Sequence, residues 1–166
     1  MVAEDDLRTV LEELHRLRTR VPQLTGALAA GVDGLVVAHD TPGVDPEGLA
    51  ALTAAALGVA VRISDHTGHG GFRELLVRGE RGYIATYAAG RTAVLTLLAQ
   101  DRVNVGRLHL EGRRSGARIG ELLDAVEAAR PLPRPTAPAR TRAPRAPRTT
   151  AAEARTAIDT RTATDS

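Results

Sequence analysis

The stretch Phe72–Ala99 reads FRELLVRGERGYIATYAAGRTAVLTLLA, and the organisation of the whole chain follows from it. Apolar and polar side chains alternate in three short runs, which two glycine-containing turns, GERG and AAGR, separate. Alternation with a period of two between such turns is typical of antiparallel strands. We therefore predict a three-stranded meander with strands at 72–78, 83–87 and 92–98. A sheet this small needs helices on at least one face to bury it.

A further hairpin is predicted upstream of the meander. Residues 25–30 (TGALAA) and 35–40 (LVVAHD) flank the turn GVDG, in which Asp33 and Gly34 form a favoured hairpin dipeptide. The first of these strands consists of small residues, and glycine and alanine are poor strand formers. We therefore expect a helix to lie close against that surface.

Three segments have helical patterns. Asp5–Arg20 places leucine and valine side chains on one stripe and charged side chains, Glu13 and Arg20 among them, off it. Asp45 suits an N-cap, and the helix after it is predicted over 46–64. A last helix is predicted over about 104–129. Small residues in its apolar stripe would allow a close approach to another helix or to the sheet, namely Gly112, Ser115 and Gly116.

The central helix is apolar on nearly every face, which is typical of a helix that is covered on most sides. After Glu47, its only ionised side chain before Asp65 is Arg62. One side can pack on the sheet, but the chain has little left to cover the other, so we predict that a second copy covers it. Some apolar side chains of the helix must face the sheet instead. The candidates for self-association are Leu49, Leu52, Ala56, Leu57, Ala60 and Ile63.

Composition divides the 166 residues into one domain, residues 1–129, and a tail, residues 130–166. The domain carries 14 Arg and 17 Asp and Glu, a net charge of −3, whereas the tail carries 8 Arg and 3 Asp and Glu, a net charge of +5. Six of the nine prolines lie in the tail, which has almost no large apolar residue. We predict that the tail is disordered. It lacks the aromatic side chains that stack on bases, so we expect a solvating segment rather than a nucleic-acid-binding one.

No residue pattern in the chain indicates catalysis, a metal or a cofactor. The sequence has no Cys and no Lys, which excludes thiolate chemistry and the lysine-dependent phosphate-binding loop. His66 and His69 form a possible metal pair, but no third ligand lies nearby except Asp65. The acidic N-terminus is no signal peptide, and the longest apolar runs fall short of the ~20 residues that span a bilayer. We therefore expect a soluble cytoplasmic protein without direct membrane insertion.

The order of the predicted elements and three local sequences resemble the roadblock (dynein light-chain/LAMTOR-type) family, in particular its actinobacterial members. These sequences are GALAAGVDGLVVAHD, DPEGLAALTAAALG and GHGGFRELLVRGERGYIATYAAG. The resemblance covers about residues 7–125 and is strongest over 25–99. It implies an α/β sandwich: a five-stranded antiparallel sheet, with the central helix on one face and the N- and C-terminal helices on the other. It also implies a homodimer formed through the central helix and the adjacent sheet edge.

The resemblance further implies a non-enzymatic regulator or scaffold that binds a small Ras-like GTPase. Actinobacterial relatives are encoded in operons (conservons) with the GTPase and a sensor-kinase-like protein, so these partners, and membrane association through them, are expected. For the GTPase contact we nominate residues around the end of the central helix, namely Arg62, His66, His69 and Arg73. The alternative is a small-molecule sensor on a similar sandwich, whose mark would be a pocket between a helix and the sheet.

Overall fold

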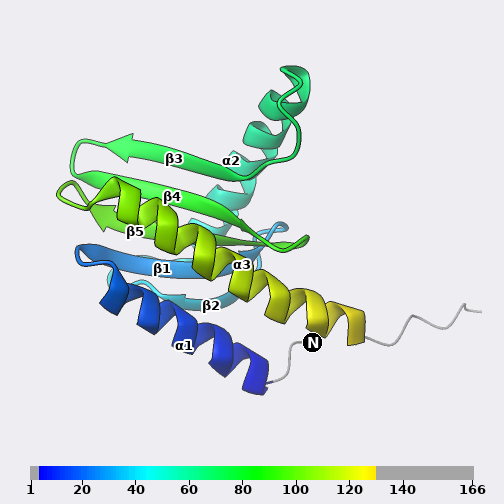
Figure 1. The fold of residues 1–166 in the computed structure, drawn as a ribbon, viewed down its shortest axis with the longest axis horizontal. Helices are drawn as coiled ribbons and strands as arrows, with labels where there is room; N and C mark the ends of the chain where they lie inside the picture. Colours follow the sequence, from blue (N-terminus) through cyan, green and yellow to red (C-terminus); the bar gives the residue numbers. More distant parts are fainter. Residues whose placement is uncertain (1–3, 130–166) are drawn as a thin grey trace, which may run out of the picture. The chain divides into compact units, whose positions relative to one another are not determined.

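A computed structural model describes residues 4–129 of the chain. The chain divides into two units, residues 1–131 and 132–166. The predicted disordered tail, residues 130–166, lies outside the described residues. The elements, coloured along the sequence in Figure 1, are α1 Glu4–Arg20, β1 Leu24–Gly31, β2 Val36–Asp40, α2 Pro46–His66, β3 Glu74–Gly79, β4 Gly82–Ala89, β5 Ala93–Gln100 and α3 Val105–Ala129.

All five strands form one antiparallel sheet in the order β2-β1-β5-β4-β3. The meander β3-β4-β5 and the hairpin β1-β2 are both present, as predicted, and β1 joins them by pairing with β5. This arrangement leaves β2 and β3 as the edge strands. The first strand of the meander begins at Glu74, two residues later than predicted, because Phe72 and Arg73 still belong to the loop that precedes β3.

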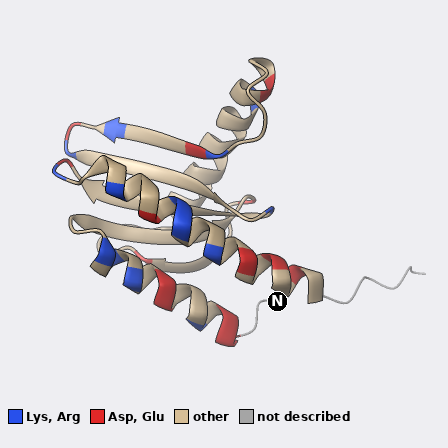
Figure 2. Ribbon diagram, viewed as in Figure 1, with Lys and Arg blue, Asp and Glu red and all other residues tan. Residues whose placement is uncertain are grey.

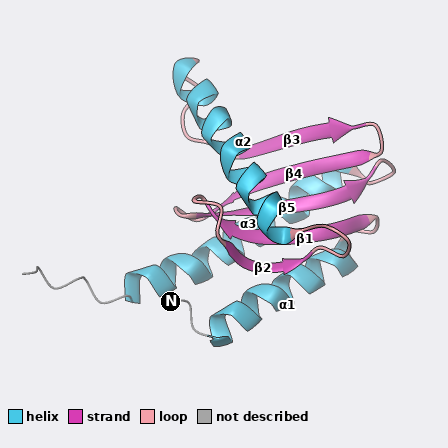
Figure 3. Cartoon of the chain, turned by 180° about the vertical axis from the view of Figure 1, so that it is seen from behind, coloured by secondary structure: helices cyan, strands magenta, loops and turns pink. Residues whose placement is uncertain are grey.

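The helices lie on both faces of the sheet. α1 and α3 cover one face, in front of the sheet in Figure 1, and α2 crosses the opposite face, in front of the sheet in Figure 3. This three-layer arrangement confirms the predicted α/β sandwich with the central helix alone on its face. It also separates a well-covered face of the sheet from one that a single helix must cover.

The main core lies between the sheet and the pair α1 and α3. The leucine and valine stripe predicted for α1 is buried there, together with alternate side chains of β1, β4 and β5 and the inner side of α3. Its largest fully buried members are Tyr87, Leu14, Leu17, Leu95, Leu97, Leu108 and Ile119. Leu28 is also fully buried, but it lies on the other face of the sheet, under α2.

α3 approaches β4 closely because glycine recurs every four residues on the side that faces the sheet. A Cβ atom at Gly112 would collide with the ring of Tyr87, and one at Gly116 would lie 2.9 Å from the carbonyl oxygen of Ala88. One at Gly120 would collide with the backbone at the β4–β5 turn. The close approach expected from the small residues of this helix is therefore confirmed as a helix–sheet contact.

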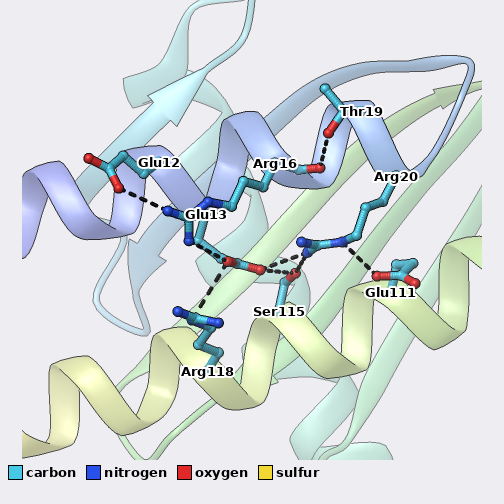
Figure 4. A network of polar contacts seen from close by, with 8 residues as sticks. All are labelled: Glu12, Glu13, Arg16, Thr19, Arg20, Glu111, Ser115 and Arg118. Atoms are coloured by element: carbon cyan, nitrogen blue, oxygen red, sulfur yellow. Dashed lines mark hydrogen bonds and ion pairs between the residues drawn. The ribbon is translucent and has the colours of Figure 1, made fainter.

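α1 and α3 are joined by a partly buried network of charged side chains (Figure 4). Glu13 Oε1 accepts hydrogen bonds from Arg20 Nη2 and Ser115 Oγ, both at 2.7 Å, and Arg20 Nε donates to Glu111 Oε2 at 2.8 Å. Arg118 lies 3.7 Å from Glu13 Oε2, an oxygen that is buried without a hydrogen bond. The sequence predicts Glu13 off the apolar stripe, yet its exposed fraction is only 3%, because α3 closes over it.

α2 is the one helix among residues 4–129 that is long and apolar enough to cross a membrane, judged by length and composition. Its apolar character is spread over many alanines and interrupted by glycine and threonine, so the helix contains no long uninterrupted run of large apolar residues. Part of the helix packs on its own sheet, and most of its remaining surface is exposed.

Candidate interaction surface

α2 is attached to the sheet through its first three turns. Asp45 caps the helix, since its Oδ2 accepts a hydrogen bond from the Gly48 amide at 3.0 Å. Ala50 packs against Leu28 and Ala30 of β1. Thr53 and Leu57 are the other two buried residues of the helix. Buried positions at intervals of three and four residues define one face, and beyond Leu57 no residue of α2 is fully buried.

A buried row of threonine hydroxyls lies under α2. The Oγ1 atoms of Thr86 on β4 and Thr96 on β5 are 3.1 Å apart, and Thr96 also reaches Thr53 Oγ1 at 3.4 Å. Because buried hydroxyls need partners, these contacts fix which side of α2 faces the sheet. They also show that Thr86 and Thr96 project from the face of the sheet that carries α2. Because side chains alternate between the two faces along a strand, the faces of the other residues of β4 and β5 follow.

The opposite side of α2 carries large apolar side chains that nothing in the described chain covers. Leu52 is 72% exposed, and Val59 and Ile63 are each 59% exposed. We call the residues of this side the α2 stripe: Leu52, Ala55, Ala56, Val59 and Ile63. Charged residues occur almost only at the ends of α2, whereas α1 and α3 carry acidic and basic side chains along their length (Figure 2).

The sheet beneath the second half of α2 is also uncovered. Leu75 pairs with Thr86 and Val77 pairs with Ile84, so all four side chains project from the α2 face. Val77 and Ile84 are exposed, and Leu75 is only half-buried. Figures 1 and 3 show why: α2 crosses the strands obliquely, and its C-terminal end projects past β3 instead of lying along the sheet.

β3 completes this region as an edge strand. It pairs with β4 from Glu74 opposite Tyr87 to Gly79 opposite Gly82, and no strand within residues 4–129 pairs with its other edge, which we call its free edge. A free edge presents unpaired amide and carbonyl groups that can accept another strand. We call the α2 stripe, the side chains of Leu75, Val77 and Ile84, and the free edge of β3 together the open face.

The structure divides the predicted self-association residues into two groups. Leu52, Ala56 and Ile63 lie on the α2 stripe, whereas Leu57 is buried against the protomer's own sheet and Leu49 packs beside the cluster around Leu28. Ala60 is half-buried. Sequence reasoning missed Val59, Val77 and Ile84. The spacing of seven residues between Leu52 and Val59 could have indicated the stripe, but the equally apolar opposite side of the helix concealed it.

The nominated GTPase-contact residues all lie around one end of α2. Arg62 and His66 belong to its last turns, His69 lies in the connection to β3, and Arg73 directly precedes that strand. All four are exposed. His69 Nδ1 lies 2.7 Å from Thr67 Oγ1, and no group of three or more potential metal ligands occurs in the described part of the chain. This end of the helix therefore offers a polar contact surface next to the open face.

Residues 10–99, which include every strand of the sheet except the last residue of β5, match the family model of the Roadblock/LC7 domain. The chain belongs to the Roadblock/LC7 domain family. An uncharacterized protein of Methanocaldococcus jannaschii, MJ0714, is 33% identical over 119 residues, which cover 71% of this chain and 97% of the relative. A second protein of that organism, MJ1340, is 33% identical over 97 residues, 58% of this chain and 84% of the relative.

Solved roadblock-type structures share the fold of this domain. An MglB structure with a tetrameric arrangement has a TM-score of 0.71 at 22% identity, covering 75% of this chain and 95% of its own. The gliding protein MglB of Thermus thermophilus has a TM-score of 0.70 at 22% identity, covering 75% and 96%. A Roadblock/LC7 domain from Streptomyces avermitilis has a TM-score of 0.64 at 24% identity, covering 69% and 97%.

Proposed function

We propose that this roadblock-domain protein forms a homodimer through the open face and acts in the cytoplasm as a non-enzymatic regulator of a small Ras-like GTPase. The observation that carries the proposal is the α2 stripe, a row of exposed apolar side chains beside a free strand edge. Burying one large aliphatic side chain contributes about 1.5–3 kcal/mol, so leaving several exposed on one face is costly unless a partner covers them.

A second copy of the chain fits the open face because a two-fold axis can bring both the β3 edge and the α2 stripe into contact with the same face of the partner. Two β3 edges can pair antiparallel about a two-fold axis, which would continue the sheet from one protomer into the next. The C-terminal end of α2 projects past β3, so in such a dimer it would lie over the partner's sheet. Val59 and Ile63 would then cover the partner's exposed Val77 and Ile84.

The GTPase part of the proposal is supported by the family resemblance and by the position of Arg62, His66, His69 and Arg73. These side chains surround the end of α2, next to the proposed dimer contact. A regulator that acts by contact needs no catalytic group of its own, since it can favour one conformation of its partner. We further propose that a sensor-kinase-like protein of the same operon is a partner, and that the protein associates with the membrane through its partners.

The self-association part is tested with two matched substitutions. Val59 on α2 and Leu110 on α3 have the same exposed fraction, 59%. We expect sedimentation to detect a wild-type dimer, a monomeric Val59→Arg variant and a dimeric Leu110→Arg variant, because only the first substitution places a charge in the proposed contact. A wild-type chain that remains monomeric at about 100 µM, where even a weak dimer would be populated, contradicts the proposal.

The GTPase part is tested with a small Ras-like GTPase encoded beside this gene. We expect the purified GTPase to bind the dimer and its rate of GTP hydrolysis or nucleotide release to change when the dimer is added. Substituting Arg62 and Arg73 together by alanine should weaken binding without changing the oligomeric state. Absence of binding to a correctly loaded GTPase, with the dimer intact, would overturn this part alone.

The small-molecule alternative has less support. One hollow between a helix and the sheet lies between α1 and β2, where Leu7, Leu11 and Val37 are among its lining residues. It is wide open to solvent, whereas ligand pockets usually enclose most of their ligand.

A further inference from the structure

β3 is the strand with the fewest attachments in the sheet. Among the described strands it pairs only with β4, and its residues from Leu76 onwards are exposed. α3 lies mainly over β4 and β5, so it leaves most of the side of β3 that faces away from α2 uncovered. The free edge proposed for self-association therefore belongs to a strand that its own protomer holds weakly.

One cluster of side chains ties the start of this strand to α3. Arg113 donates two hydrogen bonds to Glu74, from Nε to Oε2 and from Nη2 to Oε1, each at 2.6 Å. Behind this pair, Tyr87 Oη lies 3.0 Å from His109 Nδ1, which is 3.8 Å from Glu74 Oε1. Burial, and then the charge of Glu74, raise the pKa of Tyr87, and its protonated hydroxyl can donate to Nδ1 in the tautomer of His109 that leaves this nitrogen without a proton. We call the Glu74–Arg113 pair the β3 clamp.

We propose that Glu74 and Arg113 are positioning residues for self-association: the β3 clamp orders the edge strand so that a second copy can pair with it. This inference rests on the proposed homodimer. Glu74 is the first residue of β3 and projects from the α3 side, while Leu75 and Val77 project from the open face. Holding Glu74 on α3 therefore fixes the pleat and register that the open face presents.

The geometry of the pair explains why it can order a strand. An exposed ion pair contributes little to folding when both side chains are free to move, but a bidentate arginine–carboxylate contact restricts both partners. Pairing with a partner strand requires the backbone of β3 to be ordered, which costs conformational entropy. Because the clamp already restricts the start of β3 in the monomer, less of that entropy is lost on association, and folded copies bind each other more tightly.

The experiment compares dissociation constants between folded copies, which a loss confined to folding stability does not change. We expect Arg113→Ala and Glu74→Gln each to raise the dissociation constant about threefold to tenfold, and Arg113→Lys to raise it less, since lysine cannot form the bidentate contact. Arg107→Ala is the matched control, because it removes the same charge from an exposed position of the same helix. The exchanged pair Glu74→Arg with Arg113→Glu should restore association to within about twofold of the wild type.

A second readout follows the strand itself. In the Val59→Arg background, which we expect to be monomeric, amide hydrogen exchange in residues 74–79 should be faster with Arg113→Ala than with Arg107→Ala. If the wild type dimerises and the dissociation constants of Arg113→Ala and Glu74→Gln equal that of the wild type, the proposed role of the β3 clamp is wrong, while the proposed homodimer is unaffected. Equal weakening by Arg107→Ala would also overturn it, because net charge would then be the cause. A wild type that does not dimerise overturns the proposed function and the clamp together.

Discussion

Glu13 is the residue at which burial and charge oppose each other most directly. Burial alone would raise the pKa of its carboxyl group, but hydrogen bonds from Arg20 and Ser115 and the charges of Arg20 and Arg118 outweigh that effect. The pKa in the folded protein is therefore lower than the ordinary value of 4.5. The folded state stabilises the ionised carboxylate relative to the unfolded state, so the contribution of this network to the free energy of unfolding depends on pH.

We predict that Glu13→Ala lowers the free energy of unfolding by about 2–3 kcal/mol near neutral pH, since Arg20 and Ser115 lose a charged partner. The contribution of Glu13 is fully present above about pH 4.5 and is lost as the pH falls through the lower folded-state value. Urea denaturation between about pH 7 and about pH 3 should show a steeper loss for the wild type than for Glu13→Gln. Parallel profiles for the two proteins would contradict this assignment.

At the contact between α3 and β4, Gly120 is the position where an added side chain would meet rigid backbone most closely. We predict that Gly120→Ala lowers the free energy of unfolding by about 3 kcal/mol or more, because the new Cβ would lie 2.7 Å from the carbonyl carbon of Ala89 in rigid backbone. Gly106→Ala, on the same helix, meets only Asn104 Oδ1 at 3.4 Å and should be close to neutral. Thermal or urea unfolding measures both, and similar losses for the two variants would contradict the close-approach explanation.

At the scale of one element, α2 has an inner side that packs on the sheet of its own protomer and an outer side, the α2 stripe, that is exposed. We predict that Leu57→Ala lowers the unfolding free energy of the monomer by about 2–3 kcal/mol, because Leu57 is buried against the sheet. Leu52→Ala should change it by less than about 0.5 kcal/mol, because Leu52 is exposed in one copy.

The order of effects should reverse in association. In the proposed dimer, Leu52→Ala weakens binding between folded copies more than Leu57→Ala does. Unfolding experiments in the Val59→Arg background and sedimentation in the wild-type background separate the two quantities. If Leu57→Ala proved the more harmful to association, the division of α2 into two sides would be wrong.

The outer side of α2 could be predicted only in part from its sequence. Alanine, leucine, valine and isoleucine occur around the whole circumference, so apolar periodicity gives the helix no preferred direction. This is why Leu57 was predicted beside Leu52 as a contact residue while Val59 was missed. The threonine row from β4 and β5 orients the helix, and its members come from strands far away in the sequence.

At the scale of the whole molecule, the proposed dimer joins apolar surfaces rather than opposite charges. We predict that the thermal midpoint rises with protein concentration in the wild type and not in Val59→Arg, because association stabilises the folded state by mass action. Between about 0.1 M and about 0.5 M NaCl, the dissociation constant should rise by no more than the loss of the β3 clamp would raise it, since salt screens that charge pair and not the apolar contacts. A dimer that dissociates steeply with added salt would contradict an apolar interface.

The sequence by itself determined the eight elements, because alternation, glycine turns, helix caps and apolar stripes are local patterns. Its resemblance to the roadblock family, carried by the order of those elements and by three local sequences, implied the sandwich class. It also predicted that the central helix has more apolar surface than one sheet can cover. Only the tertiary structure decided where that surface lies, that Glu13 is buried and that Glu74 meets Arg113. Those facts depend on which distant segments meet, and the sequence pattern of one helix or strand carries no record of its neighbours.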